Sequence, residues 1–403
     1  MLALNGTKLC LNVEKIMLSL ESAILIIGIV QGVFLILTLM AKSSNKHQAN
    51  RYLVLLLSAF VMALSAQWLS VSGYADNMKP LFVIASSVVF LFGPLLYFYV
   101  KSLTLSAAKV RFFGVPHLVP FCCYLVLVSY AVFFSTAELK IVTDESLSDF
   151  SAAQLLLPLL KLAHVICYTV VCLVLLIRYA RRIKQCFSNI DNINLLWLRN
   201  LVIGFILFES ALIAALLFDL NAFAVASNAD TILSFVLVLL IFMTGFYGMH
   251  QPAILQMPFE FETSPRNNSD NNIAAQNDDK IAGPKNLRPE DISMISSKLA
   301  ALTSQRIYLD RFLNLQTLSD SVGVSQHKMS EYLNSHIGMT FYEYVNKARI
   351  EDSKQRLIES QQSILDIALD VGFNNKATFN KAFKSFESAT PSEFRRRSKA
   401  QAR

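Results

Sequence analysis

Charged residues are scarce in this sequence: Asp, Glu, Lys and Arg make up 16% of its 403 residues, whereas they make up about 25% of an ordinary soluble domain. The scarcity is confined to one part of the chain. Residues 1–250 contain 27 charged residues, and residues 286–403 contain 30 in less than half that length. This uneven distribution excludes a single soluble domain and predicts two parts in different surroundings.

Cysteine is also scarce, and the six cysteines show neither a pairing pattern nor the spacing of a metal site. Without a Cys-x-x-Cys or Cys/His pattern, we expect no disulfide framework and no structural zinc. The sequence likewise contains no catalytic motif and no glycine-rich phosphate-binding loop. We therefore expect no enzymatic activity, no cofactor and no metal.

The first part of the chain contains seven apolar segments, each long enough to cross a bilayer. A hydrocarbon core about 30 Å thick requires about 20 apolar residues in a helix. The segments that meet this requirement are 22–41, 52–72, 80–100, 115–134, 155–177, 200–218 and 231–249. Positive charges follow the first segment and do not precede it, which argues against a removable signal peptide. Residues 1–250 are therefore predicted to form a seven-helix transmembrane bundle.

The loops between these segments differ in their content of Lys and Arg. The loops after segments one, three and five contain three, three and five basic residues, and the other loops contain one, one and none. Because Lys and Arg are retained on the cytoplasmic side, we expect a multi-pass protein with its N-terminus outside. The C-terminal part is then cytoplasmic.

Three ionisable residues within the segments are candidate sensing residues: Lys161, His164 and Glu209. In helices that run in opposite directions, Lys161 and Glu209 lie at depths that differ by about 6 Å. One interpretation is a buried polar cluster that binds a ligand or a proton. The alternative is that Lys161 extends to the interface, while Glu209 is neutral or bonded to a neighbouring helix.

Residues 251–285 separate the two parts, and after Phe261 they consist largely of Asn, Asp, Ser, Pro and Ala. Such a composition buries little apolar surface and is typical of a disordered tether. A tether of this length has a typical end-to-end distance of ~30–35 Å. It is long enough to hold the last part clear of the lipid headgroups, and this reach is its only expected role.

Residues 286–403 are predicted to form a cytoplasmic all-helical domain. A helix is expected from Pro289 to about Leu302, and a long amphipathic helix from about Phe341 to Ile358. Two patterns of a short helix, a glycine turn and a second helix lie around the long one. The first turns at Gly323 and the second at Gly372, about 48 residues later. This is the geometry of the helix-turn-helix, which presents its second helix to the major groove.

Both second helices begin at residues that can cap a helix. Ser325 precedes the second helix of the first pattern, and Asn374 or Asn375 precedes that of the second. In the second pattern, Ser363 caps the helix that leads to the turn.

The stretch from about 290 to 398 resembles the DNA-binding domain of the AraC/XylS family of bacterial transcription regulators. The residues that carry the resemblance are the Gly372–Phe373 turn, Phe379, Phe383 and the closing Thr390–Pro391–Ser392. The resemblance implies two helix-turn-helix units that bind one face of DNA. The seven spans replace the soluble sensory domain usual in the family, so the expected location is the bacterial inner membrane.

The resemblance also implies base contacts from solvent-facing residues on the second helix of each unit. These residues are Gln326, His327, Lys328, Ser330 and Glu331 in the first unit, and Asn375, Lys376, Asn380 and Lys381 in the second. Side chains of these types can bond base edges. Many family members carry Arg or Gln in place of Glu331. The first unit is therefore expected either to contact bases weakly or to select cytosine.

Basic residues near the C-terminus are the expected phosphate partners: Lys384, Arg395, Arg396 and Arg397. Residues 376–403 contain eight basic and two acidic residues, which suits a polyanion. The alternatives for this segment are a solvated tail or a tail on the anionic inner leaflet.

The leading hypothesis is a membrane-embedded one-component transcription regulator that senses a signal through its spans and binds promoter DNA sequence-specifically. The alternatives are a membrane transporter or enzyme with an attached regulatory domain, and a protein-interaction module. The expected partners are double-stranded promoter DNA and the lipid bilayer. RNA polymerase, a second copy of the chain and an unidentified small-molecule or envelope signal are further candidates.

Overall fold

The computed structural model describes residues 2–41, 48–75, 77–104, 114–134, 152–191, 193–217, 234–244 and 287–401. Within these ranges the regular structure is helical, and β-pairing is limited to one isolated bridge. The all-α prediction is therefore confirmed for the described residues, whereas the predicted tether 251–285 lies outside them. The chain divides into two compact units, Met1–Ile177 with Leu195–Met257, and Arg178–Asn194 with Pro258–Arg403.

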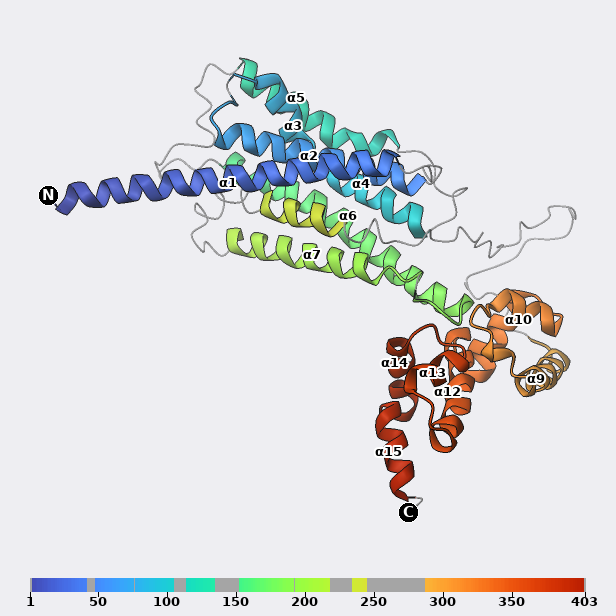
Figure 1. Cartoon of the computed structure of the whole chain (residues 1–403). Coiled ribbons are helices and arrows are strands. Elements are labelled where there is room, and N and C mark those ends of the chain that lie inside the picture. The colour runs from blue at the N-terminus through green and yellow to red at the C-terminus, as the bar shows by residue number, and fades with distance from the viewer. Residues whose placement is uncertain are drawn as a thin grey trace, which may run out of the picture. The chain divides into compact units, whose positions relative to one another are not determined.

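The first unit is here called the membrane unit, after the spans predicted in it, and its described residues form helices (Figure 1). Its elements are α1 (Leu2–Ala41), α2 (Gln48–Val71), α3 (Lys79–Ser87), α4 (Val89–Thr104), η2 (Val115–Leu118), α5 (Val119–Phe134), α6 (Ala152–Cys186), α7 (Leu196–Leu217) and the helix Ser234–Thr244. Of these, α6 continues beyond Ile177 into the second unit.

Among the described residues, three helical stretches are long and apolar enough to cross a membrane: Leu20–Ala41, Ala49–Val71 and Leu159–Cys186. A fourth is obtained if α3 and α4, which are bent by 42° relative to each other, count as one span. Three more apolar helices are shorter: Val115–Tyr130, Leu196–Leu207 and Ser234–Thr244. An apolar helix coincides with each of the seven predicted segments, but the structure supports three or four spans, and the count of seven stays a prediction.

The predicted single helix 80–100 is wrong, because the chain bends at Val88 between α3 and α4. The hydroxyls of Ser86 and Ser87 both donate to the carbonyl of Val83, at 3.1 and 2.7 Å. Serine side chains that bond back to the preceding turn compete with the helix and often bend it. Hydropathy alone does not detect this competition.

The second unit is here called the DNA-binding unit, after the function predicted for it. Its described residues after position 287 form nine helical elements (Figure 1). They are α9 (Pro289–Ser304), η3 (Ile307–Leu309), α10 (Leu315–Val322), α11 (Gln326–Glu331), η4 (Tyr332–Ile337), α12 (Phe341–Glu359), α13 (Ile364–Asp370), α14 (Lys376–Glu387) and α15 (Pro391–Gln401). The predicted first helix and the predicted long helix correspond to α9 and α12, so both are confirmed.

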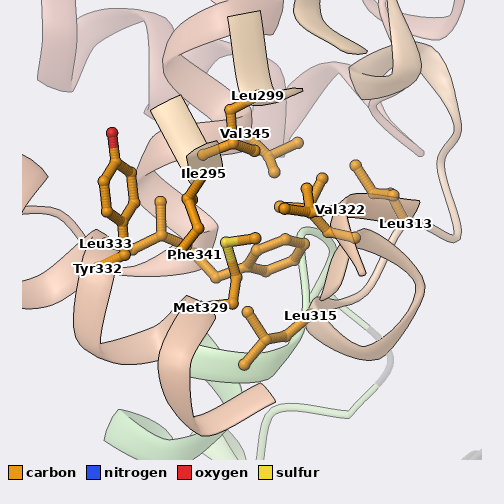
Figure 2. Packing of buried hydrophobic residues seen from close by; sticks show 11 residues of the cluster. Ile295, Leu299, Leu313, Leu315, Val322, Met329, Tyr332, Leu333, Phe341 and Val345 are labelled. Atoms are coloured by element: carbon orange, nitrogen blue, oxygen red, sulfur yellow. The ribbon is translucent and has the colours of Figure 1, made fainter. Parts of the chain in front are cut away.

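Two hydrophobic cores hold this unit together. The first, shown in Figure 2, gathers side chains from α9, the loop before α10, α10, α11, η4 and α12: Ile295, Leu299, Leu313, Leu315, Leu318, Val322, Met329, Tyr332, Leu333, Phe341 and Val345. The second gathers side chains from α12, α13, α14 and the turn between the last two: Ile350, Leu357, Ile367, Ala368, Val371, Phe373, Phe379, Ala382 and Phe383. The N-terminal half of α12 therefore belongs to the first core and its C-terminal half to the second.

The helix starts follow from capping side chains. The Oγ of Ser325 accepts from the N–H of Lys328 at 3.3 Å, and the Oδ1 of Asn375 accepts from the N–H of Thr378 at 2.8 Å. Ser363 caps α13 in the same way. Each bond satisfies an amide that the first turn of a helix leaves without an internal acceptor. The predicted caps are confirmed, with Asn375 chosen over its neighbour.

Candidate nucleic-acid interface

Two helix pairs in the DNA-binding unit have the predicted turn. Gly323 ends α10 with φ +79°, and Gly372 follows α13 with φ +95°. Both values lie in the left-handed region, which only glycine adopts without strain. A Cβ at Gly372 would lie 2.8 Å from the carbonyl oxygen of Leu309, so this turn also requires a residue without a side chain. The second helix is α11 in the first helix-turn-helix unit and α14 in the second helix-turn-helix unit.

Two of the predicted base-contacting residues on α11 have polar partners on other helices of the unit. The Nε2 of Gln326 donates to the Oε1 of Gln316 on α10. The Nζ of Lys328 lies 3.1 Å from the carboxylate of Asp291 on α9. This ion pair is exposed and is worth little in water. Lys328 can therefore exchange it for DNA at small cost.

The other three residues on α11 differ in accessibility. His327 has a side chain that is 70% exposed, and its Nδ1 lies 3.8 Å from the Oε2 of Glu331, which is 18% exposed. Ser330 is half-buried and its Oγ accepts from the Nδ2 of Asn334 at 3.2 Å. Of the three, His327 presents the most open surface to a groove.

Helix α14 presents two exposed lysines, Lys376 and Lys381. Asn380 is half-buried, and its Oδ1 is shielded from solvent without a hydrogen-bond partner. Asn375 is the cap of the helix, so its Oδ1 is occupied by the N–H of Thr378. The two lysines are therefore the free cationic groups among the four predicted base-contacting residues of this helix.

The predicted phosphate partners divide into two groups. Lys384, Arg396 and Arg397 are exposed. Arg395 is half-buried, and its Nε donates to the carbonyl of Leu357 on α12 at 3.2 Å. Because Arg395 is turned onto α12, it joins α15 to the rest of the unit. A charge count along the sequence does not separate these two roles.

A buried arginine, Arg349 on α12, connects the parts of the unit, although no motif in the sequence points to it. Its Nε donates to the carbonyl of Tyr308 at 2.7 Å, and its Nη2 to that of Asp310 at 2.8 Å. The guanidinium also lies 5.6 Å from the ring centroid of Phe373. Burial lowers the pKa of Arg349 to about 10, so the group remains charged at neutral pH.

Residues that follow α6 also lie in this unit, although they were predicted as a loop between two spans. Phe187 forms an isolated antiparallel bridge with Asn314. The Oγ of Ser188 donates to the carbonyl of Leu313 at 2.6 Å and accepts from the Nη2 of Arg349 at 3.3 Å. The sequence offers no local signal for these contacts, because they join residues that are more than a hundred positions apart.

Asp191, three residues further, contacts the first turn of α14. Its carboxylate accepts from the Nδ2 of Asn375 at 2.8 Å and from the Oγ1 of Thr378 at 2.7 Å. Burial and the negative charge of Asp191 raise the pKa of Tyr342 on α12. The acidic side chain of Asp191 therefore lies against the N-terminal end of α14.

The predicted sensing residues lie in the membrane unit, each in its own surroundings. The Nζ of Lys161 lies 4.8 Å from the ring centroid of Tyr124 on α5. The ring of His164 lies against those of Phe90 and Tyr168, with centroids 5.2 and 5.1 Å away. Neither ring nitrogen of His164 has a hydrogen-bond partner.

Glu209 on α7 is 3% exposed and contacts the Thr169 side chain of α6. Its Oε2 has no hydrogen-bond partner. Within the described part of the chain, no hydrogen bond or ion pair joins Glu209 to Lys161 or His164. Glu209 is thus buried, whereas His164 is half-buried with its two ring nitrogens shielded from solvent. The buried polar cluster of Lys161, His164 and Glu209 stays a hypothesis.

A family model described as a helix-turn-helix domain matches residues 318–397. The chain is 36% identical over 83 residues to the probable transcription factor PqrA of Proteus vulgaris. The aligned residues make up 21% of this chain and 68% of that protein. It is 37% identical over 83 residues to an uncharacterized HTH-type transcriptional regulator of Staphylococcus aureus (strain COL). The match spans 11% of that longer protein.

Solved structures similar to part of this chain include the following two. One is an AraC-type transcriptional regulator from Chromobacterium violaceum, at 22% identity and a TM-score of 0.25, covering 26% of this chain and 93% of that one. The other is the C-terminal domain of a two-component response regulator from Fusobacterium nucleatum, at 26% identity and a TM-score of 0.23, covering 25% and 97%.

Proposed function

The chain belongs to the transcription regulators that carry an AraC-type helix-turn-helix DNA-binding domain, and from this premise we propose that it is a membrane-embedded, one-component regulator of transcription. The observation that carries the proposal is the pair of helix-turn-helix units built on one helix, α12. Since α12 contributes to both cores, α11 and α14 are held in one rigid arrangement and can enter successive major grooves about 34 Å apart.

The second helix-turn-helix unit is proposed to contribute most of the affinity for DNA. Lys376 and Lys381 are exposed on α14, and Lys384 follows them on the same helix. In the first helix-turn-helix unit, α11 carries one lysine, Lys328, and Glu331 adds a negative charge on the same helix. Lysines can donate to guanine or to phosphate. A second copy of the chain, which would double the number of contacts, and RNA polymerase are the further partners that we propose.

Chromatin capture with a tagged, membrane-retained full-length protein tests DNA binding directly. We expect a set of enriched promoter sites, and binding of those sites by the purified protein that weakens steeply with salt. Counterion release lowers the logarithm of the affinity by about 0.9 for each neutralised phosphate and each tenfold rise in salt. An absence of enriched sites, or an affinity that salt does not change, would contradict the proposal.

Embedding in the inner membrane is supported by the apolar helices of the membrane unit and by the distribution of basic residues between their loops. We propose an outward N-terminus and a cytoplasmic DNA-binding unit. Cysteine labelling in intact cells tests this orientation. Lys79→Cys, at the exposed start of α3 on the proposed outer side, should react with a membrane-impermeant maleimide. Lys184→Cys should react only after the cells are opened.

Sensing is proposed to involve the buried polar groups of the membrane unit. Glu209 and His164 both have side-chain atoms that are shielded from solvent and lack a hydrogen-bond partner. A polar group inside a membrane is costly and is usually retained for a function. Glu209→Gln should alter the response of a target promoter while leaving the amount of protein in the membrane unchanged. An unaltered response would reject a ligand role for this residue.

A further inference from the structure

The segment Phe187–Asn194, which follows α6 directly, belongs to the same compact unit as the DNA-binding helices. Its described residues are locked by hydrogen bonds of their own. The Oη of Tyr179 on α6 donates to the carbonyl of Ile193 at 2.8 Å, and the Nδ2 of Asn194 donates to that of Asp191 at 2.9 Å. The segment is thus tied to the end of α6 and has a defined shape.

Ser188 anchors this segment at the junction of the two helix-turn-helix units. Its N–H and its Oγ both donate to the carbonyl of Leu313, at 3.3 and 2.6 Å. Its Oγ also accepts from Arg349, the buried residue on α12 that holds the Tyr308 and Asp310 carbonyls. Ser188 itself is 2% exposed. Removing the segment would therefore leave buried polar groups with fewer partners, which is costly.

Asp191, three residues after Ser188 in the same segment, contacts the first turn of α14. Its two carboxylate oxygens take the donors that Asn375 and Thr378 direct outward from that turn. In helix-turn-helix proteins the N-terminal residues of the second helix contact base edges, and helix N-termini also bind phosphates. A fixed carboxylate there occupies donors that DNA can use, and it repels phosphate.

We propose that the segment Phe187–Asn194 is an internal docking partner of the DNA-binding unit, and that Asp191 competes with DNA for the first turn of α14. The inference rests on the proposed function, since it presumes that α14 binds DNA. Its consequence is a direct route between the two functions of the chain. The segment is covalently continuous with α6, so a change at the end of α6 alters the competition without any contribution from residues 251–285.

Affinity measurements on the full-length protein test the competition. The protein would be reconstituted in nanodiscs of phosphatidylethanolamine and phosphatidylglycerol and titrated with a site recovered by chromatin capture. Asp191→Ala removes both acceptors and the charge, and we expect binding about tenfold tighter than that of the wild type. Asp191→Asn keeps one acceptor without the charge and should fall between the two.

The matched control is Glu359→Gln, at the exposed end of α12. It makes the same change in net charge as Asp191→Asn, and we expect the affinity of the wild type. An equal gain in both variants would assign the effect to overall charge and overturn the competition. An unchanged or weaker affinity in Asp191→Ala would also overturn it, because Asp191 would then be neutral toward α14 or help to position it for DNA.

Amide hydrogen exchange supplies the reciprocal measurement. If DNA and the segment compete, linkage requires that bound DNA weakens the docking of the segment. Exchange at residues 187–191 should then rise on addition of DNA, whereas exchange in α12 should not. Unchanged protection of 187–191 would contradict the proposal. Failure of the wild type and of every variant to bind any recovered site would instead contradict the proposed function.

Discussion

At the scale of single residues, the DNA-binding unit depends on Gly372 and Arg349, which lie next to each other and next to backbone carbonyls. Gly372 brings the turn before α14 against the carbonyl of Leu309, and Arg349 lies beside the same turn. The turn glycine was predicted from the sequence because a left-handed turn is a local requirement. Arg349 was not, because its role follows from carbonyls about forty positions away along the chain.

Gly372→Ala is expected to destabilise the DNA-binding unit by about 2–3 kcal/mol, the sum of left-handed strain and a clash with a backbone oxygen. Gly338→Ala is the matched control. Gly338 has φ +76°, but a Cβ there would meet nothing within 4 Å, so only about 1 kcal/mol is expected. Denaturant-dependent hydrogen exchange of α12 and α14 amides measures both free energies of unfolding. Equal losses would contradict the close approach.

Arg349→Met should cost about 3 kcal/mol or more, because it leaves the carbonyls of Tyr308 and Asp310 buried without their donors. Lys347→Met removes a positive charge from the exposed side of the same helix and should cost under about 0.5 kcal/mol. The same exchange measurement compares them. A small loss for Arg349→Met would mean that water replaces the guanidinium.

The two neighbouring arginines of α15 should behave differently. Arg396→Gln, at an exposed position, should lower the salt dependence of DNA binding by about one phosphate contact without loss of stability. Arg395→Gln removes the bond to Leu357 and should lower stability instead, with the salt dependence unchanged. Titrations at several salt concentrations, together with thermal unfolding, separate the two outcomes. The opposite pattern would show that Arg395 contacts a phosphate, as the sequence predicted.

At the scale of elements, the parts that the sequence predicted well are those with local causes. The caps at Ser325, Ser363 and Asn375, the glycine turns and the bounds of α9 and α12 all follow from a few adjacent residues. The break at Val88 and the docking of residues 187–191 were missed. The first depends on competition for backbone carbonyls, and the second on contacts between distant parts of the chain.

Helix α12 begins with a capping box, in which Thr340 caps the N–H of Glu343 and the Glu343 carboxylate accepts from the N–H of Thr340. Thr340→Ala should therefore destabilise the unit by about 1 kcal/mol. Because Phe341 and Val345 follow at once, exchange should rise more in the first core than in the second. Ser363→Ala, which removes the cap of α13, should reverse that order. Hydrogen exchange resolved by residue distinguishes them.

At the scale of the whole molecule, the sequence predicted a chain with an apolar part and a polar helical part, and both are present in the described residues. Hydropathy does not fix the number of spans, because it measures the composition of a segment and not the length of unbroken helix that the segment forms. The DNA-binding unit is better predicted, since two similar patterns around one long helix leave few alternative arrangements.

The rigid link between the two helix-turn-helix units predicts a fixed spacing of their two half-sites on DNA. Inserting 5 or 10 base pairs between the half-sites of a recovered promoter should in both cases reduce the affinity to that of one unit. If the units were joined flexibly, the insertion of 10 base pairs would restore binding, because it returns both grooves to the same face. Titration of the three DNA fragments decides between these outcomes.

The contribution of α12 to both cores also bears on how such regulators can be recombined. A chimera that takes one helix-turn-helix unit from another protein cannot be joined in a loop, since the border between the two cores lies within the helix, between Val345 and Ile350. The junction must preserve Arg349 and the carbonyls that it binds. Exchange of DNA specificity between relatives is therefore expected to proceed by substitution on α11 and α14, or by transfer of both units together.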